Sequence, residues 1–212
     1  MLEGSQLQAE LKLSRLQNHS ANLLQSVDFL LRSLTWKLED INLIASGIGP
    51  GSFTGIRIGI ATGIGLAQFL SIPFAGVSGF EALAYQVVSL EGSVGVLLNA
   101  RRGQVYYAEY RNAGGRMSAA KKPSLEFLSD LPQLFKNRRL YLIGDTELCQ
   151  KDLLGGSTKD WPRIVETDPY LATGIGRRAL SSRRRWRSGA FLQCEPLYVR
   201  PPDAIKNRDG SR

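Results

Sequence analysis

The sequence predicts a layered α/β fold in two lobes. Short apolar runs alternate with helical apolar patterns along most of the chain, which is typical of sheets covered by helices. The chain has 212 residues, of which 43% are apolar, so it can bury a core for one large domain or two small lobes. The pattern changes near residue 92, and we therefore expect an N-terminal lobe over residues 1–91 and a C-terminal lobe over residues 92–212.

Periodicity and turn residues define the first lobe. Residues 6–13 alternate polar and apolar side chains, as a strand with one solvated face does. Apolar residues at three- and four-residue steps predict a helix over residues 20–36. Residues 41–48 are largely apolar and predict a strand buried on both faces. A Gly-Pro-Gly break follows, and then a second helix over residues 54–70.

The next elements lead into the second lobe. Phe74–Val77 reads as a short strand, and Ser78 with Glu81 forms a capping box at the start of a helix. The second lobe is predicted to open with a hairpin. Its expected elements are strands at 94–98 and 104–110, a helix at 125–135, a strand at 140–143, a helix at 146–154, a strand at 163–165 and a helix at 170–185.

The glycine-rich turn before the second helix resembles a phosphate-binding loop in composition. It lacks the lysine of a P-loop, and Ser52 stands where the dinucleotide pattern requires its third glycine. Backbone N–H groups at a helix start still attract anions. The candidate anion-binding turn consists of Gly49, Gly51, Ser52, Thr54 and Arg57.

A stripe of glycines recurs every four residues. Gly55, Gly59 and Gly63 lie on one face of the second expected helix, where each costs about 1 kcal/mol relative to alanine. A face without side chains allows another element to approach closely, and we expect a helix there. The stripe packs either inside its own lobe, for instance on the first helix, or against a partner chain. The spacing leaves both alternatives open.

The residues offer no catalytic constellation. A single histidine, His19, cannot form a two-histidine metal motif, and the two cysteines lie far apart. We therefore expect no catalytic residue and no metal site. The net charge of +8 is concentrated in residues 177–187, which indicates either RNA contact through Arg183, Arg184 and Arg185 or a solvated helix end.

The chain carries no sign of a membrane or secreted protein. No apolar run approaches the roughly 18 residues of a membrane span, and the first residues lack the pattern of a secretory signal. The cysteines are read as two reduced thiols. We expect a cytoplasmic protein.

Several stretches resemble the bacterial TsaB (YeaZ) family. The most specific is Gly47-Ile-Gly-Pro-Gly-Ser-Phe-Thr-Gly-Ile-Arg. Asn99-Ala-Arg-Arg-Gly-Gln-Val-Tyr-Tyr is similar to the family's D-A-R-x-x-E-V-Y segment, with Asn99 and Gln104 in place of its acidic residues. Tyr198-Val-Arg-Pro-Pro-Asp-Ala is similar to its Y-L-R-P-x-D-A ending.

The resemblance implies an actin/Hsp70-like fold and a non-catalytic role in making threonylcarbamoyladenosine in tRNA, at the adenosine beside the anticodon. It implies pairing with the catalytic paralogue TsaD and with the ATPase TsaE, as well as homodimers, while tRNA is engaged indirectly. This chain alone would bind no cofactor, and ATP or ADP would belong to the complex. The implied partner interface lies on the first two helices, at His19, Leu23, Val27, Leu30, Gly55, Gly59 and Gly63.

The resemblance also shows a departure. Family members begin with a strand of the form I-L-A-I-D-T-S, which has no counterpart before Leu2. Without it, residues 41–48 would be left with unpaired backbone groups, at about 1–3 kcal/mol for each. We therefore expect the natural start to lie upstream of Met1. A chain that begins at Met1 is expected to be poorly stable and to bind no nucleotide.

Two other readings stay open beside the partner-subunit hypothesis. The first is a stand-alone nucleotide hydrolase or metallopeptidase of the actin-like superfamily, which would show metal-dependent turnover. The second is a tRNA-binding module that works through residues 177–187, where charge reversal would abolish RNA binding.

Overall fold

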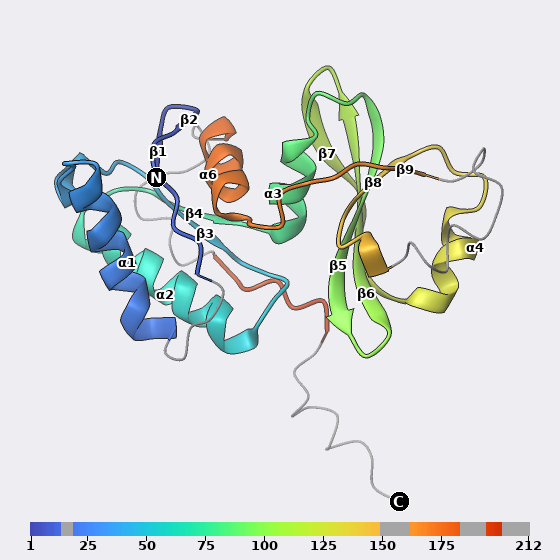
Figure 1. The fold of residues 1–212 in the computed structure, drawn as a ribbon, viewed down its shortest axis with the longest axis horizontal. Helices are drawn as coiled ribbons and strands as arrows, with labels where there is room; N and C mark the ends of the chain where they lie inside the picture. Colours follow the sequence, from blue (N-terminus) through green and yellow to red (C-terminus); the bar gives the residue numbers. More distant parts are fainter. Residues whose placement is uncertain (14–18, 149–161, 183–193, 201–212) are drawn as a thin grey trace, which may run out of the picture. The chain divides into compact units, whose positions relative to one another are not determined.

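The computed structural model describes residues 1–13, 19–148, 162–182 and 194–200. The chain divides into two units (Figure 1). Unit 1 comprises Met1–Ala82 with Tyr170–Leu197, and unit 2 comprises Leu83–Pro169 with Tyr198–Arg212.

The core of unit 1 is a parallel pair of short strands between two helices. β3 (Ile44–Gly47) pairs in register with β4 (Phe74–Val77). Because side chains alternate between the faces of a strand, Ile44 and Phe74 face α2 (Phe53–Phe69), while Ala45 and its neighbours face α6 (Ala172–Ser181). Unit 1 therefore has three layers, helix, sheet and helix.

The remaining elements of unit 1 surround these layers. β1 (Leu2–Glu3) and β2 (Gln6–Leu7) form a small hairpin that packs on α6, where Gly176 leaves room for the Leu2 side chain. α1 (His19–Ser33) lies beside α2 and is followed by the short η1 (Leu38–Asp40) (Figure 1). α3 (Gly79–Gln86) follows β4, and the chain passes from unit 1 into unit 2 within this helix, at Leu83.

Unit 2 is built on a five-stranded mixed sheet with the order β7-β6-β5-β8-β9. β5, β6 and β7 are antiparallel neighbours, and β8 and β9 add in parallel. The short η2 and α4 follow β7, and α4 covers one face of the sheet, where Phe135 meets Tyr107 edge to face with ring centres 5.5 Å apart. The bounds are β5 (Gly92–Arg101), β6 (Gln104–Ala113), β7 (Arg116–Phe127), η2 (Leu128–Asp130), α4 (Leu131–Phe135), β8 (Tyr141–Gly144) and β9 (Arg163–Ile164).

A buried polar cluster fastens the segment after α4 to this sheet. Arg138 Nη2 donates to both carboxylate oxygens of Glu109, at 2.7 Å each, and the Tyr107 hydroxyl donates to Glu109 Oε2 at 3.0 Å. Burial and the neighbouring carboxylate raise the pKa of Tyr107, so its hydroxyl remains a donor. The buried charge of Glu109 is thus held by two partners.

The glycine stripe of α2 faces the unit's own sheet. A Cβ on Gly63 would lie 2.6 Å from Phe74 Cε2, and a Cβ on Gly59 would lie 3.3 Å from Ser46 Oγ. For these two positions, packing inside the unit is therefore the correct alternative. The expectation that another helix approaches them is wrong, because the neighbour is the β3–β4 pair.

Most of the expected elements are present, with shifted ends. The strand at Phe74–Val77 is confirmed, as is the capping box, in which Glu81 N donates to Ser78 Oγ at 3.1 Å and Ser78 N donates to Glu81 Oε2 at 3.4 Å. The hairpin at the start of unit 2 is confirmed and is longer than expected.

Two expectations were wrong in part. The helix expected over residues 125–135 begins only at Leu131, because residues 125–127 pair with β6 as the end of β7. The strand expected over residues 6–13 is limited to Gln6–Leu7. Among the described residues, β4 is the only strand that pairs with β3. Most of the helix expected at 146–154 lies outside the described residues.

The close approach of α2 to the sheet can be tested with two alanine substitutions in the same helix. We expect Gly63→Ala to lower the free energy of unfolding by about 1–3 kcal/mol, because the added methyl overlaps the buried Phe74 ring. Gly65 has open space around its Cβ position, so Gly65→Ala should raise it by about 0.5–1 kcal/mol. Urea unfolding measures both, and a stabilising Gly63→Ala would contradict the packing described.

The polar cluster of unit 2 gives a second prediction. Arg138→Ala leaves the Glu109 carboxylate with only the Tyr107 hydroxyl, and we expect a loss of about 1–3 kcal/mol, less than for a fully buried pair because Arg138 is partly exposed. The adjacent Arg139 is exposed, and Arg139→Ala should change stability by less than about 0.5 kcal/mol. Equal effects of the two substitutions in urea unfolding would show that the cluster contributes nothing specific.

Candidate functional site

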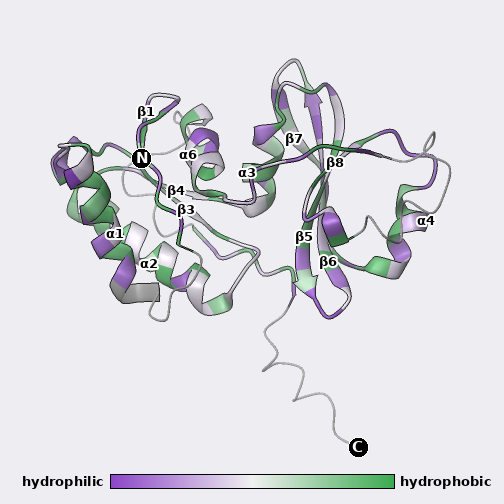
Figure 2. Cartoon of the chain, viewed as in Figure 1, coloured by the Kyte–Doolittle hydropathy of each residue, from purple (hydrophilic) through white to green (hydrophobic). Residues whose placement is uncertain are grey.

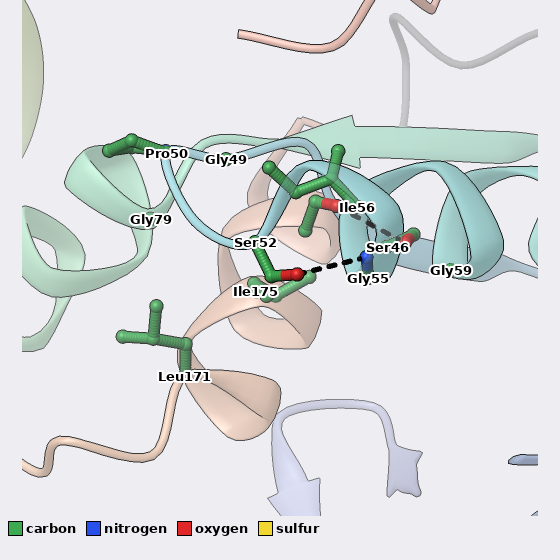
Figure 3. A pocket seen from close by; sticks show the side chains of 11 residues that line it. Ser46, Gly49, Pro50, Ser52, Gly55, Ile56, Gly59, Gly79, Leu171 and Ile175 are labelled. Atoms are coloured by element: carbon green, nitrogen blue, oxygen red, sulfur yellow. Dashed lines mark hydrogen bonds between the residues drawn. The ribbon is translucent and has the colours of Figure 1, made fainter. Parts of the chain in front are cut away.

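The backbone of the turn between β3 and α2 is closely packed at Gly49. Gly49 has a φ of 111°, and a Cβ there would lie 2.8 Å from the Leu197 carbonyl oxygen. Its own carbonyl accepts a hydrogen bond from Gly79 N at 2.8 Å. Ser52 caps α2, since its Oγ accepts from Gly55 N at 3.3 Å (Figure 3). Only glycine satisfies the backbone at position 49 without strain.

A cavity of about 320 Å³ opens beside this turn. It is lined by the end of β3, the turn, the first two turns of α2, the start of α3 and the start of α6 (Figure 3). The lining residues are small or apolar, namely Ser46, Gly47, Gly49, Pro50, Ser52, Gly55, Ile56, Gly59, Gly79, Leu171 and Ile175.

The chemistry that this cavity can support is narrow. Among the described residues that line it, none carries an ionisable side chain. Its polar groups are two serine hydroxyls and backbone amides. Such a lining can hold an apolar group or a backbone segment.

The residues of the candidate anion-binding turn are only partly brought together. Gly49 and Ser52 line the cavity, whereas Gly51, Thr54 and Arg57 do not. The Arg57 guanidinium lies 4.0 Å from the centre of the Phe53 ring. Anion binding at this turn stays a prediction.

The expected interface residues separate into two groups. His19 begins α1, and Leu23, Val27 and Leu30 are half-buried along it. Gly55 and Gly59 line the cavity, and Gly63 is buried against Phe74. The second group therefore lies on the inner side of α2.

Sequence reasoning missed the outer side of the same helices. Phe29 of α1 is 58% exposed, and Phe69 at the end of α2 is 76% exposed. Leu24 and Phe53 are exposed as well. Figure 2 shows apolar residues along both helices. The signal was available in the sequence, because Phe29 lies outside the apolar stripe that predicts the inner face of α1.

The structure also bears on the expected arginine cluster, metal ligands, membrane helices and cysteines. Arg183, Arg184 and Arg185 lie outside the described residues. In the described part of the chain, no three His, Cys, Asp or Glu side chains gather as a metal ion would require. None of the described helices has the length and apolar character to cross a membrane. Burial raises the pKa of the Cys194 thiol, which makes it a poor nucleophile.

Comparison with known proteins shows which family the chain belongs to. The family model described as "TsaD: tRNA N6-adenosine threonylcarbamoyltransferase" matches residues 13–142, more than half of the chain. The "tRNA threonylcarbamoyladenosine biosynthesis protein TsaB" of Bacillus subtilis is 33% identical over 145 residues, which are 66% of this chain and 63% of that protein. The chain belongs to the TsaB/YeaZ family.

Another TsaB protein is similar in sequence to this chain over a shorter stretch. The Escherichia coli protein of the same name is 41% identical over 97 residues, which are 45% of this chain and 42% of that protein. The chain thus spans less than two thirds of the length of these TsaB relatives.

Solved structures of the family share the fold. YeaZ from Pseudomonas aeruginosa has a TM-score of 0.64 at 23% identity, covering 87% of this chain and 86% of that one. A second Pseudomonas aeruginosa structure, described as similar to peptidase YeaZ, has a TM-score of 0.66 at 24% identity, covering 87% and 85%. The mixed α/β fold of the chain is therefore the YeaZ fold.

Proposed function

We propose that the chain is a non-catalytic subunit for the threonylcarbamoyl modification of tRNA at the adenosine beside the anticodon. One observation carries this proposal: the aligned relatives from Bacillus subtilis and Escherichia coli are both tRNA threonylcarbamoyladenosine biosynthesis proteins.

The subunit acts in this proposal by pairing with a TsaD-like catalytic partner and a TsaE-like ATPase in the cytoplasm. ATP or ADP belongs to the assembled complex, and tRNA is engaged through it. The stand-alone hydrolase or peptidase has less support, because the Bacillus subtilis and Escherichia coli relatives are named as biosynthesis proteins of threonylcarbamoyladenosine.

The pairing surface in this proposal is the outer side of α1 and α2. On α2 this side carries Arg57, Ala61 and Gly65, which lie opposite the inward-facing Gly59. Small residues allow a helix of the partner to approach, and exposed aromatic side chains supply apolar contact area. Phe29 and Phe69 are the most exposed of these aromatic residues. A homodimer would use the same surface.

We expect the double substitution Phe29→Asp with Phe69→Asp to weaken pairing with the same organism's TsaD-like protein by about 30-fold or more, because central apolar contacts dominate such interfaces. Isothermal titration calorimetry of the purified proteins measures the effect. Ile164→Asp is the matched control, since Ile164 is an exposed apolar residue of unit 2.

The control should bind as the unsubstituted chain does, and circular dichroism should show that all three chains are folded. Unchanged affinity of the double variant would contradict the assigned surface. If the unsubstituted chain does not bind the TsaD-like protein at all, the proposed function itself is wrong.

A further inference from the structure

Two sequence motifs that lie far apart in the chain meet at one end of the unit 2 sheet. Arg200 Nη2 donates a hydrogen bond to Gln104 Oε1 at 2.5 Å, and its guanidinium lies 6.0 Å from the centre of the Tyr106 ring. Gln104 and Tyr106 alternate with Val105 and Tyr107, which are buried in the core beneath α4. Gln104 and Tyr106 therefore lie on the face of β6 that is turned away from this core.

Cross-strand pairs extend this face. Phe127 of β7 and Arg101 of β5 are both register partners of Gln104, and paired residues point to the same side of a sheet. Phe127 is 55% exposed, although its side chain is aromatic. The arginine–aromatic face, as we define it, consists of Arg101, Arg102, Tyr106, Phe127 and Arg200.

The hairpin end of this face carries exposed positive charge. Arg101 and Arg102 are exposed at the tip of the β5–β6 hairpin. In the described part of the chain, no carboxylate forms an ion pair with Arg101 or Arg200. The nearby carboxylate of Asp145 accepts from Asn99 N at 2.6 Å and so holds the hairpin backbone.

The backbone at the tip is held in a conformation that does not suit arginine. Arg101 and Arg102 have φ values of 59° and 55°, in the left-handed region where a tight hairpin favours glycine or asparagine. Asn99 braces the irregular pairing, since its Oδ1 accepts from Arg101 N at 2.7 Å. Strained residues that are kept in place by their surroundings occur most often at functional sites.

We infer that the arginine–aromatic face binds unpaired nucleotides of an RNA. The arginines neutralise phosphates, while Phe127 and Tyr106 offer rings on which bases stack. An acidic peptide would use the charges but has no bases for the two rings, so the aromatic side chains favour RNA. The inference rests on the proposed function only for the source of the RNA, since the modified adenosine lies in a tRNA loop.

The test is fluorescence anisotropy of the full 212-residue chain with a labelled RNA stem–loop, titrated at several salt concentrations. We expect Arg101→Gln with Arg102→Gln to weaken binding at least about tenfold, and to lower the salt slope by roughly 0.7 for every phosphate that is no longer neutralised. Phe127→Leu should weaken binding without changing the salt slope, because it removes only stacking.

The matched control is Arg111→Gln with Arg116→Gln, which removes two exposed arginines near the far end of the same sheet. It should retain nearly full affinity, and thermal unfolding should show every variant folded. The inference is overturned if the control loses as much affinity as the tip variant, if a fully paired RNA duplex binds equally well, or if ATP or polyglutamate displaces the stem–loop completely.

The two proposals fail separately. Loss of RNA binding with intact pairing to the TsaD-like protein would remove this inference and leave the proposed function standing. Intact RNA binding without pairing to the TsaD-like protein would remove the proposed function and leave this inference standing.

Discussion

The backbone of α2 lies close against the β3–β4 pair because Gly59 and Gly63 present no side chains to it. This close packing sets the geometry of unit 1. It aligns Ile56 and Ile60 with Phe74 in one core cluster and leaves the face of the sheet with Ala75 and Val77 for α6. The glycines cost helix propensity, and the burial of apolar side chains around them offsets that cost.

The same constraint determines what the helix can offer to a partner. With its glycine face turned inward, α2 exposes the side that carries Ala61 and Gly65, between Phe53 and Phe69. The described residues that line the cavity at its start are small or apolar. The exposed apolar side chains of the outer helix face are what the proposed pairing would need.

Local signals in the sequence predicted the elements well where a single pattern dominates. The capping box at Ser78 and Glu81 needs only two residues at the right spacing, and the structure contains both of its hydrogen bonds. Residues 125–127 are predicted as the start of a helix, but they pair with Gln104–Tyr106 at the open end of the β6–β7 hairpin. Strand pairing of this kind is decided by tertiary contacts that no local pattern reveals.

The candidate site shows the same limit. Spacing alone placed Gly55, Gly59 and Gly63 on one helix face, but it could not say whether a sheet or a partner lay opposite them. Likewise, the contact of Arg200 with Gln104 joins two motifs 96 residues apart. Family resemblance predicts association through the first two helices, and the structure shows which side of each helix is exposed.

The proposed pairing surface is tested most directly by hydrogen–deuterium exchange of the chain alone and mixed with the TsaD-like protein of the same organism. If the outer side of α1 and α2 is the pairing surface, peptides covering residues 19–33 and 53–69 gain protection on binding, and those covering residues 116–127 exchange as before. Protection confined to β7 or to other parts of unit 2, with α1 and α2 unchanged, would contradict the assigned pairing surface.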